Sequence, residues 1–178
     1  NTGQLHTVKL QDVPFGKFRD KGVPIDNISN YDSQKEYAIT VESQTSLNLY
    51  RLLFVTSQAM MKVVDGGEFD VAKRTVAATK LQDNDEVISV EIIREQKQVI
   101  LQSAEGYFLR FGLEEVPEKK KSAVGVRGMK LSDKDHVEAV YYTLAAMPDP
   151  DIVYKDKHVE LQRIKPQHRD SKGTKLRL

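Results

Sequence analysis

The 178-residue chain contains no cysteine and no tryptophan, and only 7% of its residues are aromatic. Without cysteine it can form no disulfide framework, no thiolate zinc site and no cysteine nucleophile. It also lacks the run of about 18 apolar residues that a membrane span requires, and no signal-peptide pattern opens it. Because 39% of its residues are hydrophobic and 30% are charged, we expect an ordered cytoplasmic chain that forms one domain with a hydrophobic core.

Sequence motifs of catalysis are absent as well. The four histidines have no metal-ligand spacing, and no nucleophile elbow, zinc-protease motif, phosphate-binding loop or dinucleotide fingerprint occurs. Two aspartate pairs, residues 83 and 85 and residues 133 and 135, lack the glycine and distant glutamate of a calcium loop. Because both pairs fall at the same place in a repeat, we interpret them as turn residues that cap their own backbone. We expect no catalytic residue, no metal and no cofactor in this chain.

The charges are balanced in number but not in position, since the net charge is only +1. Residues 1–117 hold 13 Lys and Arg against 17 Asp and Glu, whereas residues 118–178 hold 14 against 9. A basic part of this kind indicates a surface that meets a polyanion such as nucleic acid. The acidic part keeps an alternative open, a propeller-like module for protein–protein contact with a basic tail that only solubilises it.

Apolar residues alternate with a period of two, and no ten-residue amphipathic helix with proper caps is apparent. The expected strands cover residues 52–56, 60–64, 87–93, 99–102, 107–111 and 137–142. Turns that contain glycine separate them, as at residues 65–67 and 104–106. A polar stretch at residues 32–46 has a further strand-like core at residues 37–41. The pattern predicts an all-β chain.

An internal repeat organises these strands. Residues 80–87 are echoed by residues 130–137, where Lys, Leu, both Asp and Val match. A third copy lies near the N-terminus, because residues 3–14 mirror residues 106–117 without a gap. A period near fifty residues, with several short strands in each copy, indicates a propeller in which every repeat forms one small antiparallel sheet, or blade.

A finer alignment matches residues 55–57 with residues 101–103, and Lys62 of the following strand with Arg110. The apolar side chains that alternate along the strands are interpreted as core. They include Leu101, Phe108, Phe111, Val140 and Tyr142.

The repeats divide the chain into approximate units. Three blade-like copies are followed by a basic C-terminal segment, and the boundaries are 1–46, 47–97, 98–147 and 148–178. The stretch at residues 147–151, with two prolines, is the clearest linker. Because residues 1–3 sit at a hairpin turn, we expect the first strand of the first copy to lie upstream and the chain to be part of a larger protein.

Several segments resemble one known family, the C-terminal domain of the A subunits of bacterial type IIA topoisomerases. The most specific is Ala123-Val-Gly-Val-Arg-Gly-Met-Lys-Leu131, which is very similar to that family's Gly-Val-Arg-Gly segment. The resemblance covers nearly the whole chain. The other matching segments are Gly3–His6 with Asp12–Pro14, Lys21-Gly22, Lys73-Arg74 with Lys80–Asp85, Gly106–Phe111 with Glu115–Pro117, and Arg163–Lys165 with Lys172–Lys175.

The resemblance implies a β-pinwheel, an all-β, propeller-like disc of four-stranded blades, here a partial disc of about three to four blades. In the A subunits of gyrase and topoisomerase IV, the basic rim of this disc binds duplex DNA without sequence specificity and bends it. The chain would then be a non-catalytic part of an ATP-hydrolysing DNA isomerase that changes supercoiling near the nucleoid. Its partners would be DNA, the ATPase B subunit, and the other domains of the A subunit. ATP and Mg would belong to the parent enzyme.

Two departures from the family pattern matter. Met60 stands where the hairpin usually has glycine, so we expect this turn to differ. The Gln-Arg-Arg-Gly-Gly-Lys-Gly box of gyrase is not visible, which leaves gyrase and topoisomerase IV both open.

DNA bent around a rim needs cations spaced to meet phosphates, and the repeat supplies basic residues at recurring places. Arg127 is the strongest single candidate, because flanking Gly125 and Gly128 let the backbone approach a phosphate that the arginine fork can grip. No exposed aromatic residue can be identified for base stacking, so single-strand binding is not expected. The predicted DNA-binding residues are Arg19, Lys21, Lys73, Arg74, Lys119, Lys120, Lys121, Arg127, Lys130, Arg169, Lys172 and Lys175.

Overall fold

Segments rich in β-branched and aromatic residues form the longer strands of the molecule. The computed structural model describes residues 1–176. Its strands are β1 (Gln4–His6), β2 (Arg51–Thr56), β3 (Met60–Asp65), β4 (Thr75–Ala77), β5 (Val87–Ile93), β6 (Gln96–Ser103), β7 (Tyr107–Gly112), β8 (Val126–Arg127), β9 (Val137–Leu144), β10 (Asp151–Tyr154), β11 (Lys157–Glu160) and β12 (Thr174–Lys175). The prediction of an all-β chain is confirmed.

Helices are few and short. They are α1 (Gln44–Leu49) and the 3-10 helices η1 (Leu10–Asp12), η2 (Ile25–Asn27), η3 (Gly66–Phe69), η4 (Leu113–Glu115) and η5 (Leu161–Arg163). None of the helices in the described part of the chain is long and apolar enough to cross a membrane.

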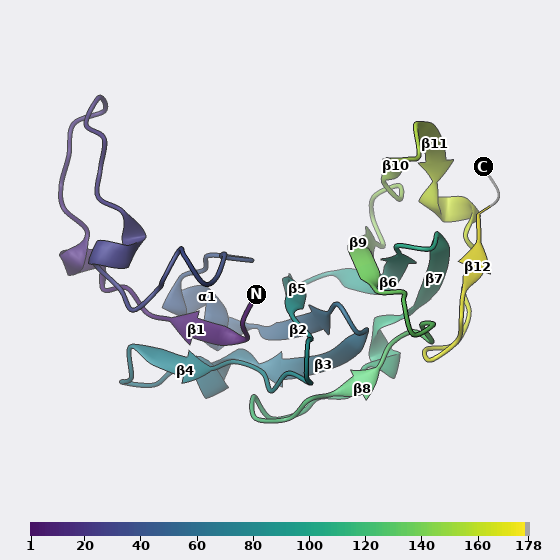
Figure 1. Ribbon diagram of the computed structural model, residues 1–178, viewed down its shortest axis with the longest axis horizontal. Coiled ribbons are helices and arrows are strands. Elements are labelled where there is room, and N and C mark those ends of the chain that lie inside the picture. The colour runs from purple at the N-terminus through teal and green to yellow at the C-terminus, as the bar shows by residue number, and fades with distance from the viewer. Residues whose placement is uncertain (177–178) are drawn as a thin grey trace.

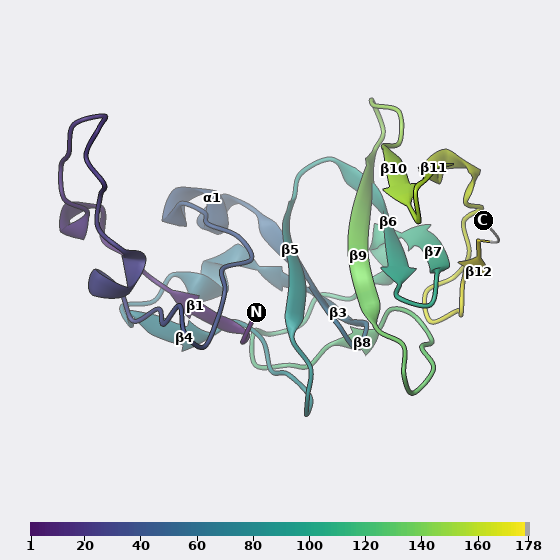
Figure 2. The same cartoon turned by 45° about the horizontal axis from the view of Figure 1, so that its top comes forward.

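The sheets follow one another along an arc (Figure 1). Two four-stranded antiparallel sheets lie in its middle, in the strand orders β5-β2-β3-β8 and β9-β6-β7-β12. The β1-β4 pair lies on the N-terminal side of them and the β10-β11 hairpin on the C-terminal side. Figure 2 shows β5 and β9 side by side, where the hydroxyls of Ser89 and Tyr142 are 2.7 Å apart. The arrangement is the predicted partial disc of blades.

Each four-stranded sheet takes its last strand from the following repeat. β2 and β3 form a hairpin, β5 returns to pair with β2, and β8 arrives from the next repeat to pair with β3. In the same way β12 pairs with β7, and β4 pairs with β1. We call β4, β8 and β12 the exchanged strands. They are only two or three residues long, too short to carry an alternating pattern, so the sequence did not predict them.

The hairpin turn that lacks glycine keeps the shape of the others. Ala59 takes the left-handed conformation, with φ 61°, and Gly3 and Gly106 do the same at φ 76° and 85°. The N–H of Ala59 donates to Thr56 O at 2.9 Å, as that of Gly106 donates to Ser103 O at 2.9 Å. The expectation of a different turn at Met60 is therefore wrong, because alanine adopts the glycine conformation at a cost of about 1–2 kcal/mol.

These turns also correct the alignment of the repeats by one residue. Because Ala59 corresponds to Gly106, Lys62 corresponds to Leu109 and not to Arg110. Successive residues of a strand point to opposite faces, so Lys62 and Arg110 face different neighbouring sheets. The expected match of Lys62 with Arg110 is wrong, and the buried lysine is specific to one repeat.

Apolar side chains fill the spaces between successive sheets. Phe54 and Phe69 pack between the first two sheets with ring centroids 6.1 Å apart. Leu53 and Leu101 belong to the cluster between the two four-stranded sheets. A third cluster lies between β6–β7 and the last hairpin. Of the predicted core residues, Leu101, Phe108 and Phe111 are fully buried, and Val140 and Tyr142 are partly buried.

The second aspartate of each repeated pair closes a turn, as the sequence predicted. Asp85 Oδ1 accepts the N–H of Gln58 and that of Glu86, both at 2.9 Å. Asp135 Oδ1 accepts the N–H of Glu105 at 2.9 Å and that of the following residue at 3.0 Å. Each carboxylate thus ties the turn before an outer strand to the hairpin turn of the same sheet.

Two segments are built differently from the expectation. Residues 37–41 form no strand, and the connection after them ends in α1, whose N-terminus is capped by Ser43 Oγ accepting the N–H of Ser46 at 3.1 Å. Beyond the linker at residues 147–151, β10 and β11 form a hairpin followed by η5, which repeats the order β7–η4. Hence part of the basic C-terminal segment has the same local structure as the repeats before it.

Candidate nucleic-acid interface

The exchanged strands place one residue of each repeat at an equivalent outward position. The N–H groups of Ala78, Gly128 and Leu176 donate to the carbonyls of the turn residues Gly3, Ala59 and Gly106. Hydrogen-bonded and non-hydrogen-bonded pairs alternate along an antiparallel ladder. The preceding residues, Ala77, Arg127 and Lys175, therefore all occupy non-hydrogen-bonded edge positions, and all three are exposed.

Three stretches of chain surround these strands, residues 73–80, 119–130 and 169–175, and we call them the convex edge. In Figure 1 β4, β8 and β12 lie along the convex side of the arc, whereas β5 and β9 lie toward its concave side. Ten of the twelve predicted DNA-binding residues belong to the convex edge. The exchange therefore gathers residues that are about fifty positions apart in the sequence onto one side of the molecule.

Two parts of the convex edge run side by side. Met129 bridges to Ser171, the N–H of Lys130 donates to Ser171 O at 2.9 Å, and that of Asp170 donates to Gly128 O at 2.7 Å. This pairing brings Arg127 and Lys130 next to residues 169–172. Lys130 is exposed, and its ammonium has no hydrogen-bond partner among residues 1–176.

Arg127 is less free than its sequence context suggests. Its guanidinium forms an ion pair with Asp170, with Nε donating to Oδ1 and Nη2 donating to Oδ2 at 3.2 Å. The hydrogen bond from Arg127 holds the pKa of Asp170 below its usual value. Because the pair is partly exposed, a phosphate would have to compete with Asp170 for this arginine.

Arg169 is a structural residue. Its Nε donates to Glu115 O at 3.0 Å, its Nη1 donates to Arg127 O, and its own N–H donates to Glu115 Oε2 at 3.0 Å. The side chain is half-buried and joins η4 to the exchanged segment. The structure places Arg169 beside Arg127, but it uses the guanidinium for backbone carbonyls.

The lysine cluster at residues 119–121 is held in a similar way. Lys120 pairs with Glu68 at 3.1 Å, and the N–H and ammonium of Lys121 donate to Glu68 Oε2 and O at 2.9 and 2.6 Å. The N–H of Lys121 and the ammonium of Lys120 keep the pKa of Glu68 below its usual value. Lys119 is exposed and has no side-chain partner in the described part of the chain.

A buried lysine that the sequence did not mark as a site residue supports this loop. Lys62 is fully buried, and its Nζ donates to the carbonyls of Lys120, Lys121 and Ala123 at 3.1, 2.7 and 2.7 Å. Burial lowers the pKa of Lys62 to about 8. The lysine thus fixes the loop that leads into β8.

Lys172 and Lys175 flank one aromatic ring. Their ammonium groups lie 4.7 and 5.1 Å from the ring centroid of Tyr107. Contacts of this kind are worth about 0.5–1 kcal/mol at exposed sites. Both charges remain accessible to an anion and are kept at a fixed place on the convex edge.

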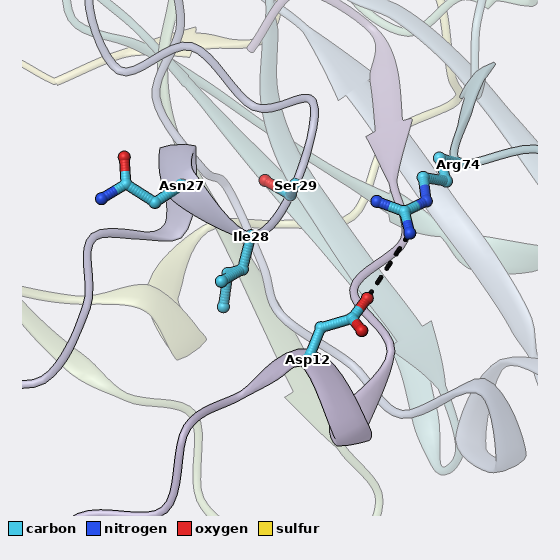
Figure 3. A pocket seen from close by; sticks show the side chains of 5 residues that line it. All are labelled: Asp12, Asn27, Ile28, Ser29 and Arg74. Carbon is cyan, nitrogen blue, oxygen red and sulfur yellow. Dashed lines mark ion pairs between the residues drawn. The ribbon is translucent and has the colours of Figure 1, made fainter.

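At the other end of the convex edge, Arg74 lines a shallow polar cavity of about 320 Å³ (Figure 3). Its Nη2 lies 3.6 Å from Asp12 Oδ2, and Asn27, Ile28 and Ser29 complete the lining. The neighbouring Lys73 is exposed and has no side-chain partner in the described residues.

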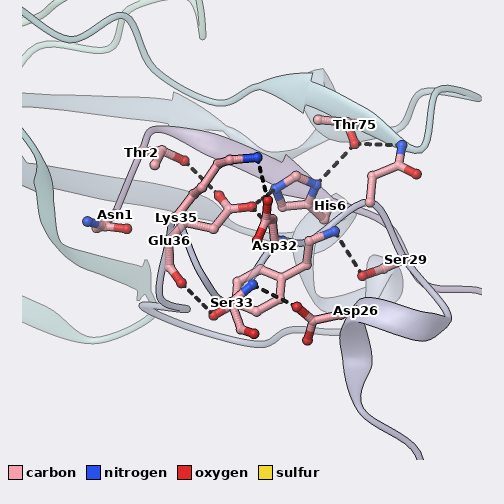
Figure 4. A network of polar contacts seen from close by, with 12 residues as sticks. Asn1, Thr2, His6, Asp26, Ser29, Asp32, Ser33, Lys35, Glu36 and Thr75 are labelled. Carbon is pink, nitrogen blue, oxygen red and sulfur yellow. Dashed lines mark hydrogen bonds and ion pairs between the residues drawn. The ribbon is translucent and has the colours of Figure 1, made fainter.

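A polar network, drawn in Figure 4, fastens the long connection after η2 to the first sheet. His6 Nε2 lies 2.9 Å from Glu36 Oε1, and its Nδ1 lies 3.0 Å from the hydroxyl of Thr75 in β4. Burial alone would raise the pKa of Glu36, but hydrogen bonds from the Thr2 hydroxyl and the Asp32 N–H outweigh it and lower the pKa. The network orients β4 and therefore this end of the convex edge.

Two predicted residues lie apart from the others. Arg19 and Lys21 are in the loop between η1 and η2, which projects from the N-terminal end of the arc in both views (Figures 1 and 2). The same loop exposes Phe15 and Phe18 completely, at 101% and 104%. The expectation that no exposed aromatic residue could be found is therefore wrong, because these residues lie in a loop with no periodic pattern. No group of residues in the described part of the chain is arranged to hold a metal ion.

The fold and its edge define a propeller-like domain with exchanged strands and a basic rim. The family model described as "DNA gyrase C-terminal domain, beta-propeller" matches residues 50–94 and 97–143. The chain belongs to this family. Family membership does not favour the alternative of an unrelated protein-interaction propeller.

Individual relatives agree with this assignment. The DNA gyrase A subunit of Lawsonia intracellularis (strain PHE/MN1-00) is 30% identical over 141 residues, which cover 78% of this chain and 17% of the relative. The DNA gyrase A subunit of Klebsiella oxytoca is 28% identical over 136 residues, covering 76% and 16%. The chain thus spans about a sixth of the length of these relatives.

Solved structures share the fold. A C-terminal domain of DNA topoisomerase IV superposes with a TM-score of 0.81 at 23% identity, over 98% of this chain and 55% of that one. A DNA gyrase A C-terminal domain superposes with a TM-score of 0.69, also at 23% identity, over 98% and 57%.

Proposed function

We propose that this chain binds duplex DNA along its convex edge, without sequence specificity, and bends it. The proposal rests on one observation, the recurrence of exposed cations beside successive exchanged strands. Lys73 flanks β4, Lys119 and Lys130 flank β8, and Lys172 and Lys175 accompany β12. Contacts to phosphates from such positions supply affinity for any sequence, because the phosphate backbone is common to all of them.

The curvature of the arc supports bending. Cations spread along a convex surface can all reach one duplex only if the duplex follows that surface. Bending a short site by 40–90° costs on the order of 1–6 kcal/mol, which several phosphate contacts can offset.

We further propose that the chain acts as the DNA-wrapping part of a topoisomerase A subunit, either of gyrase or of topoisomerase IV. It would act in the cytoplasm at the nucleoid, together with an ATPase B subunit and the remaining domains of its own protein. ATP and Mg would serve the parent enzyme's change of DNA topology, and this chain would contribute no catalytic residue.

A direct test measures affinity and DNA shape together. The chain is titrated onto two end-labelled duplexes of equal length and unrelated sequence, and energy transfer between the ends reports bending. We expect equal affinities and an equal rise in transfer on both duplexes. Binding confined to one sequence, or binding that leaves the end-to-end distance unchanged, would overturn the proposal.

A further inference from the structure

One aromatic ring on the convex edge holds two cations. The ammonium groups of Lys172 and Lys175, which we call the lysine pair, lie over the ring of Tyr107. Lys175 is the residue directly opposite Tyr107 where β12 pairs with β7. Because this is a non-hydrogen-bonded pair, the two side chains project from the same face of the sheet and lie close together.

The chain bends sharply so that Lys172 reaches the same ring. Residues three positions apart in a regular strand point to opposite faces, but Gly173 adopts φ +82° between the two lysines. A Cβ at Gly173 would lie 2.6 Å from Phe108 O, so the approach of the two strands requires glycine. The bridge between Met129 and Ser171 fixes the chain just before this bend. Lys172 is therefore held at the junction of β8 and β12.

The ring of Tyr107 is itself anchored. It is partly buried and packs against the apolar cluster between the two four-stranded sheets. Its N–H donates to Ser103 Oγ at 3.2 Å, and the hairpin turn before it is closed by the N–H of Gly106 donating to Ser103 O. A lysine side chain is a flexible four-carbon stem, so a fixed ring restricts where its ammonium group can lie.

The equivalent positions of the other two repeats carry no such pair. They are Val124 and Arg127 in the repeat of β8, and Arg74 and Ala77 in the repeat of β4. At each of these places the single cation, Arg127 or Arg74, lies within ion-pair distance of an aspartate. The lysine pair forms no ion pair with a carboxylate of residues 1–176. The third repeat thus presents two cations that the chain orders but does not neutralise.

A ring and a carboxylate hold a cation with different consequences for DNA binding. A carboxylate neutralises the cation and must be displaced before a phosphate can take its place. An aromatic ring attracts the ammonium group through its quadrupole and leaves the positive charge available to an anion. Because ordering flexible side chains on binding costs free energy, cations that are ordered beforehand bind more tightly.

We propose that Tyr107 is a positioning residue for DNA binding, whose ring holds Lys172 and Lys175 together as one contact to the phosphate backbone. This inference rests on the proposed function, because it names the residue that arranges two cations of the convex edge. Tyr107 acts through the lysine pair, so its ring is required and its hydroxyl is not.

A double-mutant cycle tests whether the tyrosine acts through the lysine pair. Duplex affinity is measured for the native chain, Tyr107→Leu, Lys172→Ala/Lys175→Ala and the triple variant. We expect Tyr107→Leu to lower the affinity about threefold with an unchanged salt slope, because no cation is lost. The lysine variant should lose about tenfold and have a slope lower by about 2. In its background Tyr107→Leu should have no further effect.

Two further variants separate positioning from folding. Tyr107→Phe keeps the face of the ring, so it should bind DNA as the native chain does. Met60→Leu is the matched control, because Met60 occupies the equivalent position opposite Arg127, where no lysine pair exists. It should leave the affinity unchanged. Denaturant unfolding of every variant verifies that binding is measured on folded protein.

The possible results distinguish this inference from the proposed function. If removal of the lysine pair weakens binding but Tyr107→Leu does not, the positioning role is overturned and DNA binding stands. An equal loss from Tyr107→Leu with and without the lysine pair, or a loss in Tyr107→Phe, also overturns the role, as does unchanged affinity without the pair. If Lys119→Ala/Lys130→Ala binds as the native chain too, the proposed function fails together with this inference.

Discussion

Two groups of cations in this chain have the same chemistry but different environments. Lys62, Arg110 and Arg169 are turned inward and donate to carbonyls or to a buried carboxylate, as Arg110 does to Asp149 at 2.6 Å. Lys119 and Lys130 are turned outward on the convex edge and have no partner within the described residues. The comparison teaches that Lys62 and Arg169 hold the exchanged segments in place, so that the outer cations are presented at fixed points, whereas Arg110 holds the linker and η5.

The largest expected effect comes from removing an inner cation. Lys62→Leu, which places at this position the residue type of the equivalent Leu109, leaves three carbonyls without their donor. We expect the free energy of unfolding to fall by about 3 kcal/mol, since each unsatisfied buried group costs about 1–3 kcal/mol. Denaturant unfolding measures it. An unchanged or higher stability would show that the lysine is not needed to hold the loop.

The inner lysine also predicts a pH dependence. Its folded pKa of about 8 lies below the ordinary lysine value of 10.5, so between these pH values the unfolded chain binds the extra proton. Stability conferred through Lys62 must then rise with pH across that window, by at most about 1.4 kcal/mol per pH unit. Unfolding of the native chain and of Lys62→Leu is compared from about pH 7.5 to about pH 10, which spans the folded pKa. If the difference in unfolding free energy between the native chain and Lys62→Leu stays constant or falls as the pH rises, the lowered pKa assigned to Lys62 is contradicted.

Removing outer cations should affect binding and not folding. For the double variant Lys119→Ala/Lys130→Ala we expect duplex affinity to fall about tenfold at moderate salt, equally for unrelated sequences, because two phosphate contacts are lost. The free energy of unfolding should be unchanged within about 0.5 kcal/mol, as is usual for substitutions at surface sites. The charge-matched control is Lys35→Ala/Lys97→Ala, which lies outside the convex edge. If the control weakens binding as much, net charge and not position is responsible.

The smallest expected effect concerns Arg127, which is exposed like the outer cations but forms an ion pair within the chain like the inner ones. Arg127 is exposed but paired with Asp170, so Asp170→Asn should free it for phosphate. We expect a roughly threefold gain in DNA affinity and a salt slope steeper by about 1. Asp133→Asn removes the same charge from an exposed turn and serves as control. A loss of affinity in Asp170→Asn would show that the ion pair positions Arg127 and does not restrain it.

Much of the fold could be predicted from the sequence, because the long strands repeat their pattern about every fifty residues. The exchanged strands could not, since two residues such as Val126 and Arg127 carry no periodicity. The repeat alignment was wrong by one residue at Lys62. When the two repeats are aligned by their hairpin turns, Lys62 and Arg110 lie one position apart, and their shared basic character suggested a match that these turns exclude.

The candidate site was predictable in outline only. Runs of basic residues near each repeat boundary indicated the convex edge, and ten of the twelve chosen residues lie there. The sequence could not show which basic side chains already form hydrogen bonds or ion pairs within the chain. Arg169 and Lys121 look like Lys130 in sequence, yet their donors are committed to Glu115 and Glu68, acids that lie more than fifty positions away.

The central claim, that the outer cations of the convex edge contact DNA, is tested most directly by a salt series. Affinities of the native chain and of Lys119→Ala/Lys130→Ala are measured on a short duplex and on one long enough to follow the arc. We predict a steep log–log slope, tighter binding to the long duplex, and a slope lower by about 2 in the variant. A flat slope, or the same slope for both proteins, would contradict the account.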